Sequence, residues 1–374
     1  MRHILHILIT GGAGFIGSHV ADELVSQGHG VRILDNLDPQ VHGEGGNLPP
    51  DLNPEVEVVI GDVRDRDRVR ESLKGVDAVI HLAAKVGVGQ SMYQIEEYTD
   101  VNERGTATLL EAVAESQIRK LVVASSMSIY GEGLMRDGRG RLVEVEGRTE
   151  AQLRRGQWEP RSAEDTPLEP APTPESKHPQ LNSIYALNKY AQERMCLLMG
   201  RAYGIDAVAL RLFNVYGTRQ ALSNPYTGVI AIFASRLLNG RRPLVFEDGL
   251  QRRDFIHVSD VARAFRMALE REEAAGRTLN IASGFNVTIE EIALRLAEAL
   301  GRPDLRPRIT GQFRVGDVRH CFADTELARR VLGFEARVPL EEGLRDLLPW
   351  LAGQVAVDRS EDAMDELARR GLVA

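Results

Sequence analysis

Residues 9–17 have the sequence Ile-Thr-Gly-Gly-Ala-Gly-Phe-Ile-Gly, and this stretch decides the fold. Before it, residues 4–9 are almost all apolar, as a parallel strand buried on both faces requires, and residues 15–27 follow with helical spacing. The glycines therefore lie at a strand-to-helix junction. Glycine there permits a tight turn and lets backbone N–H groups approach a pyrophosphate at the positive N-terminus of the helix. The stretch predicts a dinucleotide-binding turn.

An acidic residue after the next strand strengthens this prediction. Asp35 ends the apolar run at residues 31–34, 18 residues after Gly17. A carboxylate at this point can accept hydrogen bonds from both adenosine ribose hydroxyls and would repel a 2′-phosphate, so NAD is favoured over NADP. A glycine turn alone can be structural, and an aspartate alone can be a solvated loop residue. Their combination favours a cofactor site.

Composition and charge exclude several classes of protein. The chain has 374 residues, 43% of them hydrophobic and 27% charged, which is ordinary for a soluble globular protein. Its net charge of −8, without a basic block, disfavours non-specific nucleic-acid binding. No run of eighteen apolar residues and no signal peptide is present, so we expect a cytoplasmic protein without a membrane span. Cys196 and Cys321 are expected to be reduced thiols.

The order of the predicted elements indicates an α/β fold. Strand-like segments at residues 56–60, 77–82 and 121–126 alternate with helical ones, which favours a Rossmann-type, doubly wound parallel sheet. Ligands of such sheets bind beyond the carboxyl ends of the strands. The residues found at these ends are Asp62, Ala83, Ala84, Ser125 and Ser126.

We expect two lobes and a tail. Residues 1–212 are predicted to form an NAD-binding Rossmann domain. Its regular pattern is interrupted at residues 131–182, where charged residues mix with six prolines. This segment is expected to be either a functional lid or partly disordered, and a partly ordered flap over the site, anchored by Trp158, is favoured. Residues 213–353 are expected to form mainly a smaller, mixed α/β substrate-binding lobe. Residues 354–374 are predicted to be a helical tail without visible chemistry, in which the spacing of Met364, Leu367 and Ala368 indicates an amphipathic helix at residues 358–370.

A tyrosine and a lysine in the predicted helix at residues 183–201 carry the candidate chemistry. Tyr185 and Lys189 are four residues apart and therefore share one face of the helix. The lysine charge is expected to lower the tyrosine pKa from about 10 toward neutrality and to make the phenol a general base. Alone, the pair could be a half-buried tyrosine beside a lysine whose stem covers apolar surface. Beside the glycine turn, Asp35 and the serines at the strand end, a catalytic role is favoured.

Taken together, these motifs resemble the extended short-chain dehydrogenases of the nucleotide-sugar epimerase and dehydratase family over residues 4–350. The matching motifs are TGGAGFIG from residue 10, GDV from 61, HLAA from 81, VNxxGT from 101, SSxSxYG from 125, YxxxK from 185, RxFNVYG from 211 and RDFIHV from 253. The resemblance implies an NAD-dependent enzyme that acts on a nucleotide-diphosphate sugar.

The resemblance also implies roles for individual residues. The implied catalytic residues are Ser126, Tyr185 and Lys189. The implied cofactor contacts are Gly11, Gly14, Phe15, Ile16, Gly17, Asp35, Asn36, Asp62, Val63, Leu82, Ala83, Ala84, Asn102, Ser125, Tyr185 and Lys189. The implied substrate contacts are Ser126, Ser128, Tyr185, Asn214, Arg253, Arg314 and Asp317. No metal site is expected. Relatives form homodimers through helices that correspond to residues 101–115 and 183–201, so we expect a homodimer.

Two positions after Ser126 favour one reaction within the family. Relatives that are 4,6-dehydratases carry an Asp-Glu pair directly after the catalytic residue, because elimination of water needs an acid and a base. The chain has Met127 and Ser128 there, which cannot do that proton work. Decarboxylating relatives keep a Glu at the second position, and GDP-mannose 3,5-epimerase keeps a Cys. We therefore expect 4-epimerisation through a 4-keto sugar.

Alternatives to this function stay open. Residues 214–228 resemble dTDP-L-rhamnose 4-epimerase-type members, while UDP-hexose, UDP-uronate, CDP-sugar and GDP-sugar substrates remain possible. A reductase or dehydrogenase of a keto-sugar would use the same Ser-Tyr-Lys set. A non-catalytic NAD-sensing regulator is a further alternative, although such proteins usually lose the tyrosine or the lysine, and this chain keeps both.

Overall fold

A parallel sheet forms the centre of the molecule. The computed structural model describes residues 4–314 and 316–374. Within them, a seven-stranded sheet has the order β13-β9-β5-β4-β1-β2-β3, and all its neighbouring strands run parallel. Its strands are β1 (His6–Thr10), β2 (Gly30–Asp35), β3 (Glu57–Ile60), β4 (Ala78–His81), β5 (Lys120–Ser126), β9 (Asp206–Leu212) and β13 (Thr278–Ile281). Strand order reverses between β1 and β4, which is where such sheets bind ligands.

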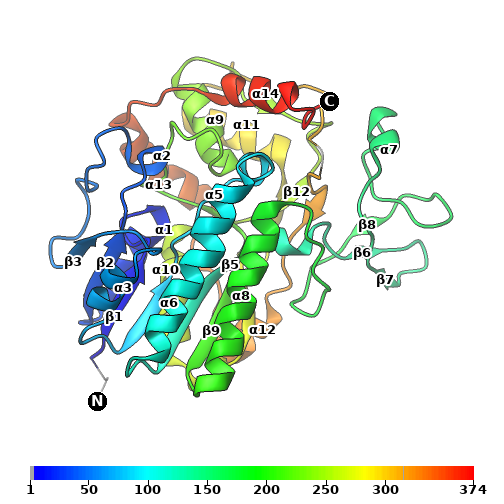
Figure 1. Cartoon of the computed structure of the whole chain (residues 1–374). Coiled ribbons are helices and arrows are strands. Elements are labelled where there is room, and N and C mark those ends of the chain that lie inside the picture. The colour runs from blue at the N-terminus through cyan, green and yellow to red at the C-terminus, as the bar shows by residue number, and fades with distance from the viewer. Residues whose placement is uncertain (1–3, 315) are drawn as a thin grey trace.

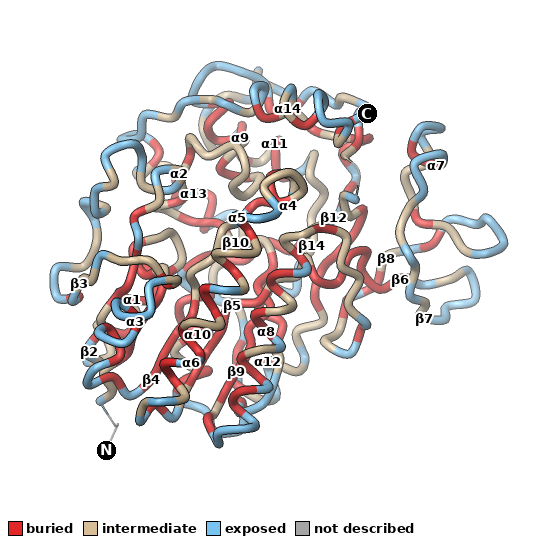
Figure 2. The backbone as a smooth tube through the Cα atoms, viewed as in Figure 1, coloured by how far each residue is buried: buried red, intermediate tan, exposed pale blue. Residues whose placement is uncertain are grey.

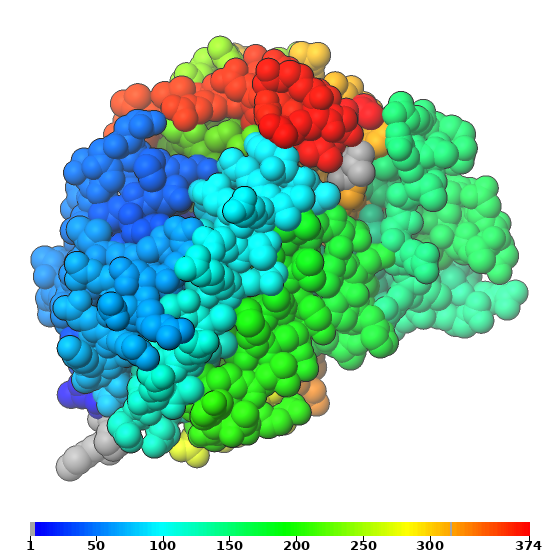
Figure 3. All heavy atoms as spheres, viewed as in Figure 1, coloured from blue at the N-terminus to red at the C-terminus, as the bar shows by residue number. Residues whose placement is uncertain are grey.

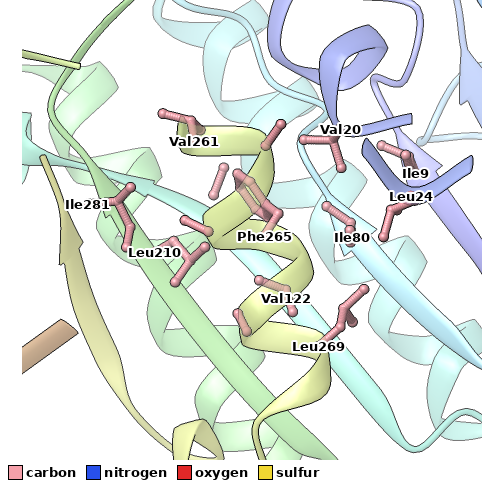
Figure 4. Packing of buried hydrophobic residues seen from close by; sticks show 14 of the residues in the cluster. Ile9, Val20, Leu24, Ile80, Val122, Leu210, Val261, Phe265, Leu269 and Ile281 are labelled. Atoms are coloured by element: carbon pink, nitrogen blue, oxygen red, sulfur yellow. The ribbon is translucent and has the colours of Figure 1, made fainter. Parts of the chain in front are cut away.

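Helices cover both faces of this sheet (Figure 1). One face packs against α1 (Phe15–Ser26), α10 (Val258–Glu270) and α12 (Glu326–Leu332), and the other against α3 (Arg66–Ser72), α6 (Gly105–Ala114) and α8 (Ile184–Tyr203). Figure 4 shows the first of these cores, where Phe265 and Leu269 of α10 lie among strand residues that include Leu210, Val122 and Ile80. The strands are buried and the outer helix faces are exposed (Figure 2). The doubly wound Rossmann fold is confirmed.

The second lobe is smaller and mixed, as predicted. Its sheet joins β10 (Asn214–Tyr216), β12 (Arg252–His257), β14 (Asn286–Thr288) and β16 (His320–Cys321). Around it lie α9 (Val229–Leu238), α11 (Ile289–Ala299), α13 (Leu340–Ala352) and the pair β11 (Leu244–Val245) and β15 (Arg308–Ile309). The expected division at residue 212 does not follow the sheet, however. Both α10 and β13 come from the later part of the chain and complete the Rossmann layers.

The segment at residues 131–182 is ordered and lies to one side. It contains β6 (Met135–Arg136), β7 (Leu142–Val143), α7 (Glu150–Arg154) and β8 (Glu169–Pro170), and the three strands form a small antiparallel sheet. In Figure 1 it projects from the edge of the molecule. Among the described residues, none from 131 to 181 lines the main cleft. Asn182, the last residue of the segment, does line the cleft, whereas the body of the segment lies beside the site and does not cover it.

Buried ion pairs explain the position of this segment. Arg148 pairs with Glu132 and with Glu247 of the second lobe, at 3.2 and 2.8 Å, and all three side chains are almost fully buried. Arg319 is completely buried and pairs with Glu159 at 2.5 Å. Trp158 packs against Phe313 with ring centroids 6.4 Å apart, so it does act as an anchor, but toward the lobe.

The C-terminal tail contains one helix, α14 (Ser360–Arg369), within the amphipathic stretch predicted at residues 358–370. It runs across the top of the molecule in Figure 1, above α9. In the part of the chain that the structure describes, no helix is both long and apolar enough to cross a membrane.

Candidate active site

A cleft of about 680 Å³ lies beyond the carboxyl ends of β1, β2, β4 and β5 and extends into the second lobe. It brings together almost all of the residues that the sequence singled out. The predicted residues that line it are Gly11, Gly14, Phe15, Ile16, Gly17, Asp35, Asn36, Asp62, Val63, Leu82, Ala83, Ala84, Ser125, Ser126, Ser128, Tyr185, Lys189, Asn214, Arg253, Arg314 and Asp317. Asn102 is the exception.

The glycines let the turn pack closely against its neighbours and leave the start of α1 open to the cleft. Gly11 has φ +70°, and a Cβ there would lie 2.9 Å from the Ala83 backbone nitrogen. A Cβ on Gly17 would lie 2.3 Å from the carbonyl oxygen of Gly11. Gly14 faces the cleft and begins α1 without a side-chain cap, so the N–H groups of the first turn are left for a ligand. These backbone features fit a dinucleotide.

Two carboxylates are fixed at the edge of the same cleft. Asp35 accepts hydrogen bonds from the backbone N–H groups of Ala13 and Leu37, at 3.0 and 2.9 Å. Asp62 accepts bonds from Arg64 and from Asn36. Burial opposes ionisation of Asp62, but these hydrogen bonds outweigh it and lower its pKa to about 2. Both carboxylates therefore hold fixed positions as acceptors beside the glycine turn.

Asn102 supports the cleft from behind. It is completely buried, and its side-chain oxygen accepts a hydrogen bond from the backbone N–H of Lys85 at 2.7 Å. Its amide nitrogen donates to the Lys85 carbonyl at 3.1 Å. This geometry does not support the direct contact between Asn102 and the cofactor that the resemblance implies. Asn102 fixes instead the loop that follows β4.

Ser126, Ser128 and Tyr185 form a hydrogen-bonded chain. The Ser128 hydroxyl donates to the Ser126 oxygen at 2.9 Å, and Ser126 hydrogen-bonds the phenol of Tyr185. Ser91 orients the start of α8, because its hydroxyl accepts the backbone N–H of Tyr185 at 3.0 Å. The sequence pattern thus places the two serines at the end of β5 and the tyrosine in the first turn of α8, where they meet.

The expected effect of Lys189 on Tyr185 is wrong for this structure. Burial raises the pKa of Tyr185 to about 12, and the hydrogen bond with Ser126 only partly offsets it. The Lys189 ammonium is itself buried, which lowers its pKa to about 8, and it donates to Gln192 at 2.7 Å. Helical spacing correctly predicted that Tyr185 and Lys189 share one face of the helix. It carries no information on how far burial removes each group from water, and this desolvation dominates both pKa values.

The substrate end of the cleft combines unpaired and paired polar groups. Among the described residues, the side-chain oxygens of Asn214 and Gln251 are buried without a hydrogen-bond partner. Arg314 pairs with Asp317 at 2.8 Å. Arg253 donates to the carbonyls of Arg252 and Arg319 at 2.9 Å and also to that of Val318. Arg253 thus braces the loop before β16 as well as facing the cleft.

Sequence reasoning missed several residues that line the cleft. Lys85 lies there with its ammonium between Asp38 and Glu97, at 3.0 and 2.8 Å. Others include Val86, Gly87, Tyr226, Arg236, Ser360, Ala363, Met364 and Leu367. The last four belong to the C-terminal helix, whose amphipathic spacing was visible but did not indicate what its buried face would contact.

The fold and the cleft together define a Rossmann-fold enzyme fitted to a dinucleotide. The family can then be stated. The chain belongs to the NAD dependent epimerase/dehydratase family, whose model matches residues 7–282. NAD is accordingly its cofactor. The match runs past residue 212 and includes β13, in agreement with the sheet that this strand completes.

Comparisons with individual proteins support this family assignment over the whole chain. The chain is 35% identical over 361 residues to a dTDP-L-rhamnose 4-epimerase of Burkholderia thailandensis, which covers 93% of this chain and 95% of the relative. The UDP-glucose 4-epimerase of Thermotoga maritima, solved with UDP-glucose, is 31% identical with a TM-score of 0.76 and coverage of 93% and 99%. The UDP-glucose 4-epimerase of Thermus thermophilus, solved with NAD, is 29% identical with a TM-score of 0.72 and coverage of 94% and 100%.

Proposed function

We propose that the chain is an NAD-dependent epimerase that inverts C4 of a nucleotide-diphosphate hexose through a transient 4-keto sugar. One observation carries this proposal. The cleft holds the Ser126, Tyr185 and Lys189 set, while each carboxylate that lines it is engaged by another group. The described carboxylates and their partners are Asp35 with Ala13 and Leu37, Asp38 and Glu97 with Lys85, Asp62 with Arg64, and Asp317 with Arg314.

This inventory leaves oxidation at one carbon as the chemistry that the site supports. Elimination of water or loss of carbon dioxide would need a further acid or base beside the sugar ring. Met127 and Ser128 occupy the positions after Ser126, and neither carries a group that titrates in the required range.

The mechanism assigns a separate task to each residue. Ser126 and Tyr185 hold the C4 oxygen, with Ser128 fixing the Ser126 hydroxyl by its own hydrogen bond. Tyr185 takes the proton of the C4 hydroxyl and gives a proton back to the C4 oxygen when the opposite epimer forms. The glycine turn and Asp35 would hold NAD, which would supply the hydride acceptor and donor for C4.

Lys189 supplies positive charge to the tyrosine during this cycle. Lys189 lies one helical turn from Tyr185 on α8, and its ammonium donates to Gln192. An ionised phenol at a buried position needs a cation nearby, because burial alone raises the pKa of Tyr185 to about 12. A turn of the lysine side chain away from Gln192 toward the phenol meets this need.

For the substrate, we favour dTDP-L-rhamnose or a related nucleotide sugar. The support is the similarity to the Burkholderia thailandensis enzyme and the loop at residues 214–228, which leads from β10 to α9 along the cleft. Alternative substrates are a UDP-hexose and a UDP-uronate. A keto-sugar reductase or dehydrogenase of the same family is the alternative reaction, because it would use the same three residues.

A panel assay separates these possibilities. Purified protein is incubated with dTDP-L-rhamnose, UDP-glucose and UDP-glucuronate, and products are identified by NMR. We expect a C4 epimer to form without added cofactor being consumed. Consumption of one NADH for each product would contradict epimerisation and favour the reductase. Absence of any reaction together with unchanged biological effect of Tyr185→Phe would favour a regulatory protein.

We also propose that the protein is a cytoplasmic homodimer. The outer faces of α6 and α8 lie side by side and carry no covering layer in Figure 1. Leu187 and Leu198, three helical turns apart on α8, are 45% and 54% exposed. Burying them against a second copy would remove apolar surface from water. Light scattering on the wild type and on Leu198→Glu tests the dimer, which the variant should weaken.

A further inference from the structure

The C-terminal segment is attached to the second lobe at its first end. Arg236 of α9 is buried, and its guanidinium donates to the Ser360 hydroxyl at 2.8 Å and pairs with Asp358 at 3.2 Å. Asn239 donates to the carbonyl of Ala356 at 2.8 Å. These contacts fix the chain just before α14 and orient the first turn of that helix.

The other end of the segment is fixed as well. Phe313 and Ala374 exchange two backbone hydrogen bonds of 2.8 and 3.0 Å, which places the last residues of the chain beside Arg314. The segment is therefore a strap, residues 354–374, tied to the lobe before and after α14.

Between these two attachments, the strap touches the Rossmann domain. A Cβ built on Gly89 of α4 (Val88–Ser91) would lie 3.3 Å from the side chain of Leu367. The guanidinium of Arg370 lies over the ring of Tyr93, 4.2 Å from its centroid. The Tyr93 hydroxyl is 2.6 Å from the hydroxyl of Tyr226, which belongs to the second lobe. Figure 3 shows the red C-terminal segment in contact with the cyan surface of the Rossmann domain. The strap thus crosses the cleft and joins its two sides.

The part of the Rossmann domain that the strap contacts lies close to the reacting end of the cleft. Ser91, in the same short helix as Gly89, accepts the backbone N–H of Tyr185 at 3.0 Å. One helix therefore contacts both the strap and the start of α8, where the proposed base lies.

The inner face of the strap is apolar after its first turn. Ser360, Ala363, Met364 and Leu367 line the cleft, and Val86 and Val88 line it from the Rossmann side. An apolar wall accepts a methyl group, whereas a hydroxyl placed against it loses hydrogen bonds to water without replacement. Such a wall discriminates by a modest factor, on the order of 10- to 100-fold, for one added hydroxyl.

We propose that α14 is a specificity-determining wall of the sugar pocket, in which Met364 and Leu367 select a 6-deoxy sugar, with a methyl group at C6, over the corresponding sugar with a hydroxymethyl group. The proposal rests on the proposed function, since it takes a nucleotide sugar as the ligand. The favoured substrate, dTDP-L-rhamnose, is a 6-deoxy sugar, and the proposal adds the residues that would recognise its methyl group.

The test measures binding and turnover of a matched ligand pair. The probes are two dTDP-sugars of the same ring configuration that differ only at C6, and the protein is the full chain with NAD bound. Calorimetry gives the two dissociation constants, and NMR gives the two rates of C4 inversion. We expect wild type to prefer the methyl sugar by about 10-fold or more.

Met364→Gln keeps the length of the side chain but adds a donor and an acceptor. We expect it to reduce the preference for the methyl sugar over the hydroxymethyl sugar by about 10-fold, measured both as the ratio of dissociation constants and as the ratio of KM values. Met364→Ala, which adds space without polar atoms, should weaken binding of the methyl sugar without improving the hydroxymethyl sugar. Asp365→Asn is the matched control, because Asp365 lies next to Met364 but is exposed, and its preference should equal that of wild type.

The possible results of this test distinguish failure of the specificity wall from failure of the proposed epimerase function. Equal affinity of wild type for both sugars, or an unchanged preference in Met364→Gln, overturns the specificity wall while epimer formation still supports the function. Preferential binding of the methyl sugar without any epimer supports the wall and overturns the epimerase. Binding of neither sugar overturns both.

Discussion

The cofactor end and the substrate end of the cleft are assembled in different ways. The cofactor end comes from a compact run of sequence, in which the glycine turn and Asp35 are joined by a backbone hydrogen bond from Ala13. The substrate end gathers residues from the second lobe, from the loop near Arg314 and from the C-terminal strap, which lie far apart in the chain. The first depends on backbone shape and the second on side-chain contacts between distant elements.

This difference leads to a first prediction about Tyr185, at the junction of the two ends. Tyr185→Phe should lower kcat by about 10³-fold, because the phenol carries the proton in both directions, while NAD retention stays near the wild-type level. Steady-state kinetics and the NAD content of the purified protein are the measurements. Tyr190→Phe on the same helix is the control, since Tyr190 is not among the residues that line the cleft. Loss of less than 10-fold in Tyr185→Phe would remove the tyrosine from the mechanism.

A smaller effect is expected when the backbone of the cofactor end is disturbed. In Gly17→Ala the new Cβ would lie 2.3 Å from the Gly11 carbonyl oxygen and 2.6 Å from the Gly12 Cα, so the turn must move. We expect a cost of about 1–3 kcal/mol, seen as a lower Tm and weaker NAD retention.

Gly138→Ala is the matched control for this variant. A Cβ on Gly138 meets no atom within 4 Å, so its Tm and NAD content should not change. Unchanged NAD retention in Gly17→Ala would show that the close approach of α1 to the glycine turn is not what shapes the cofactor end.

The smallest predicted effect concerns the charge of Asp62. Its pKa is lowered from 3.8 to about 2 in the folded protein, mainly by hydrogen bonds that overcome its burial. A carboxylate with a lowered folded-state pKa stabilises the fold above its unfolded pKa, and this contribution is lost as the pH falls through about 2. Since the side chain is a quarter exposed, we expect a contribution of about 1 kcal/mol.

Thermal melts as a function of pH measure this contribution. Asp62→Asn should be less stable than wild type at pH 6, and the gap should narrow as the pH approaches 2. Asp67→Asn, at an exposed position on α3, should have the same Tm as wild type at every pH measured. A gap that widens toward low pH would have the wrong sign for this assignment.

The same contrast explains what the sequence could predict. Residues 9–17 and Asp35 were recognisable because strand, turn and helix are local patterns, and Tyr185 and Lys189 because helical spacing fixes a shared face. The pKa of Tyr185 was predicted in the wrong direction, since burial depends on elements that are distant in sequence.

Long-range contacts account for the other differences between the sequence-based predictions and the structure. The segment at residues 131–182 is held at the side by ion pairs with Arg319 and Glu247, which no local pattern indicates. The amphipathic spacing of α14 predicted a buried face but not the cleft that this face lines. The strand β13 shows the same limit, because pairing with β9 cannot be read from its four residues.

The most direct test of C4 inversion uses a nucleotide sugar labelled with deuterium at C4. The reaction is run in ordinary water, and the product is analysed by NMR and mass spectrometry. If one carbon is oxidised and then reduced at its other face within a single binding event, the epimer keeps deuterium at C4 and no free NADH accumulates. Loss of the label to solvent, or a product lacking water or carbon dioxide, would contradict the account.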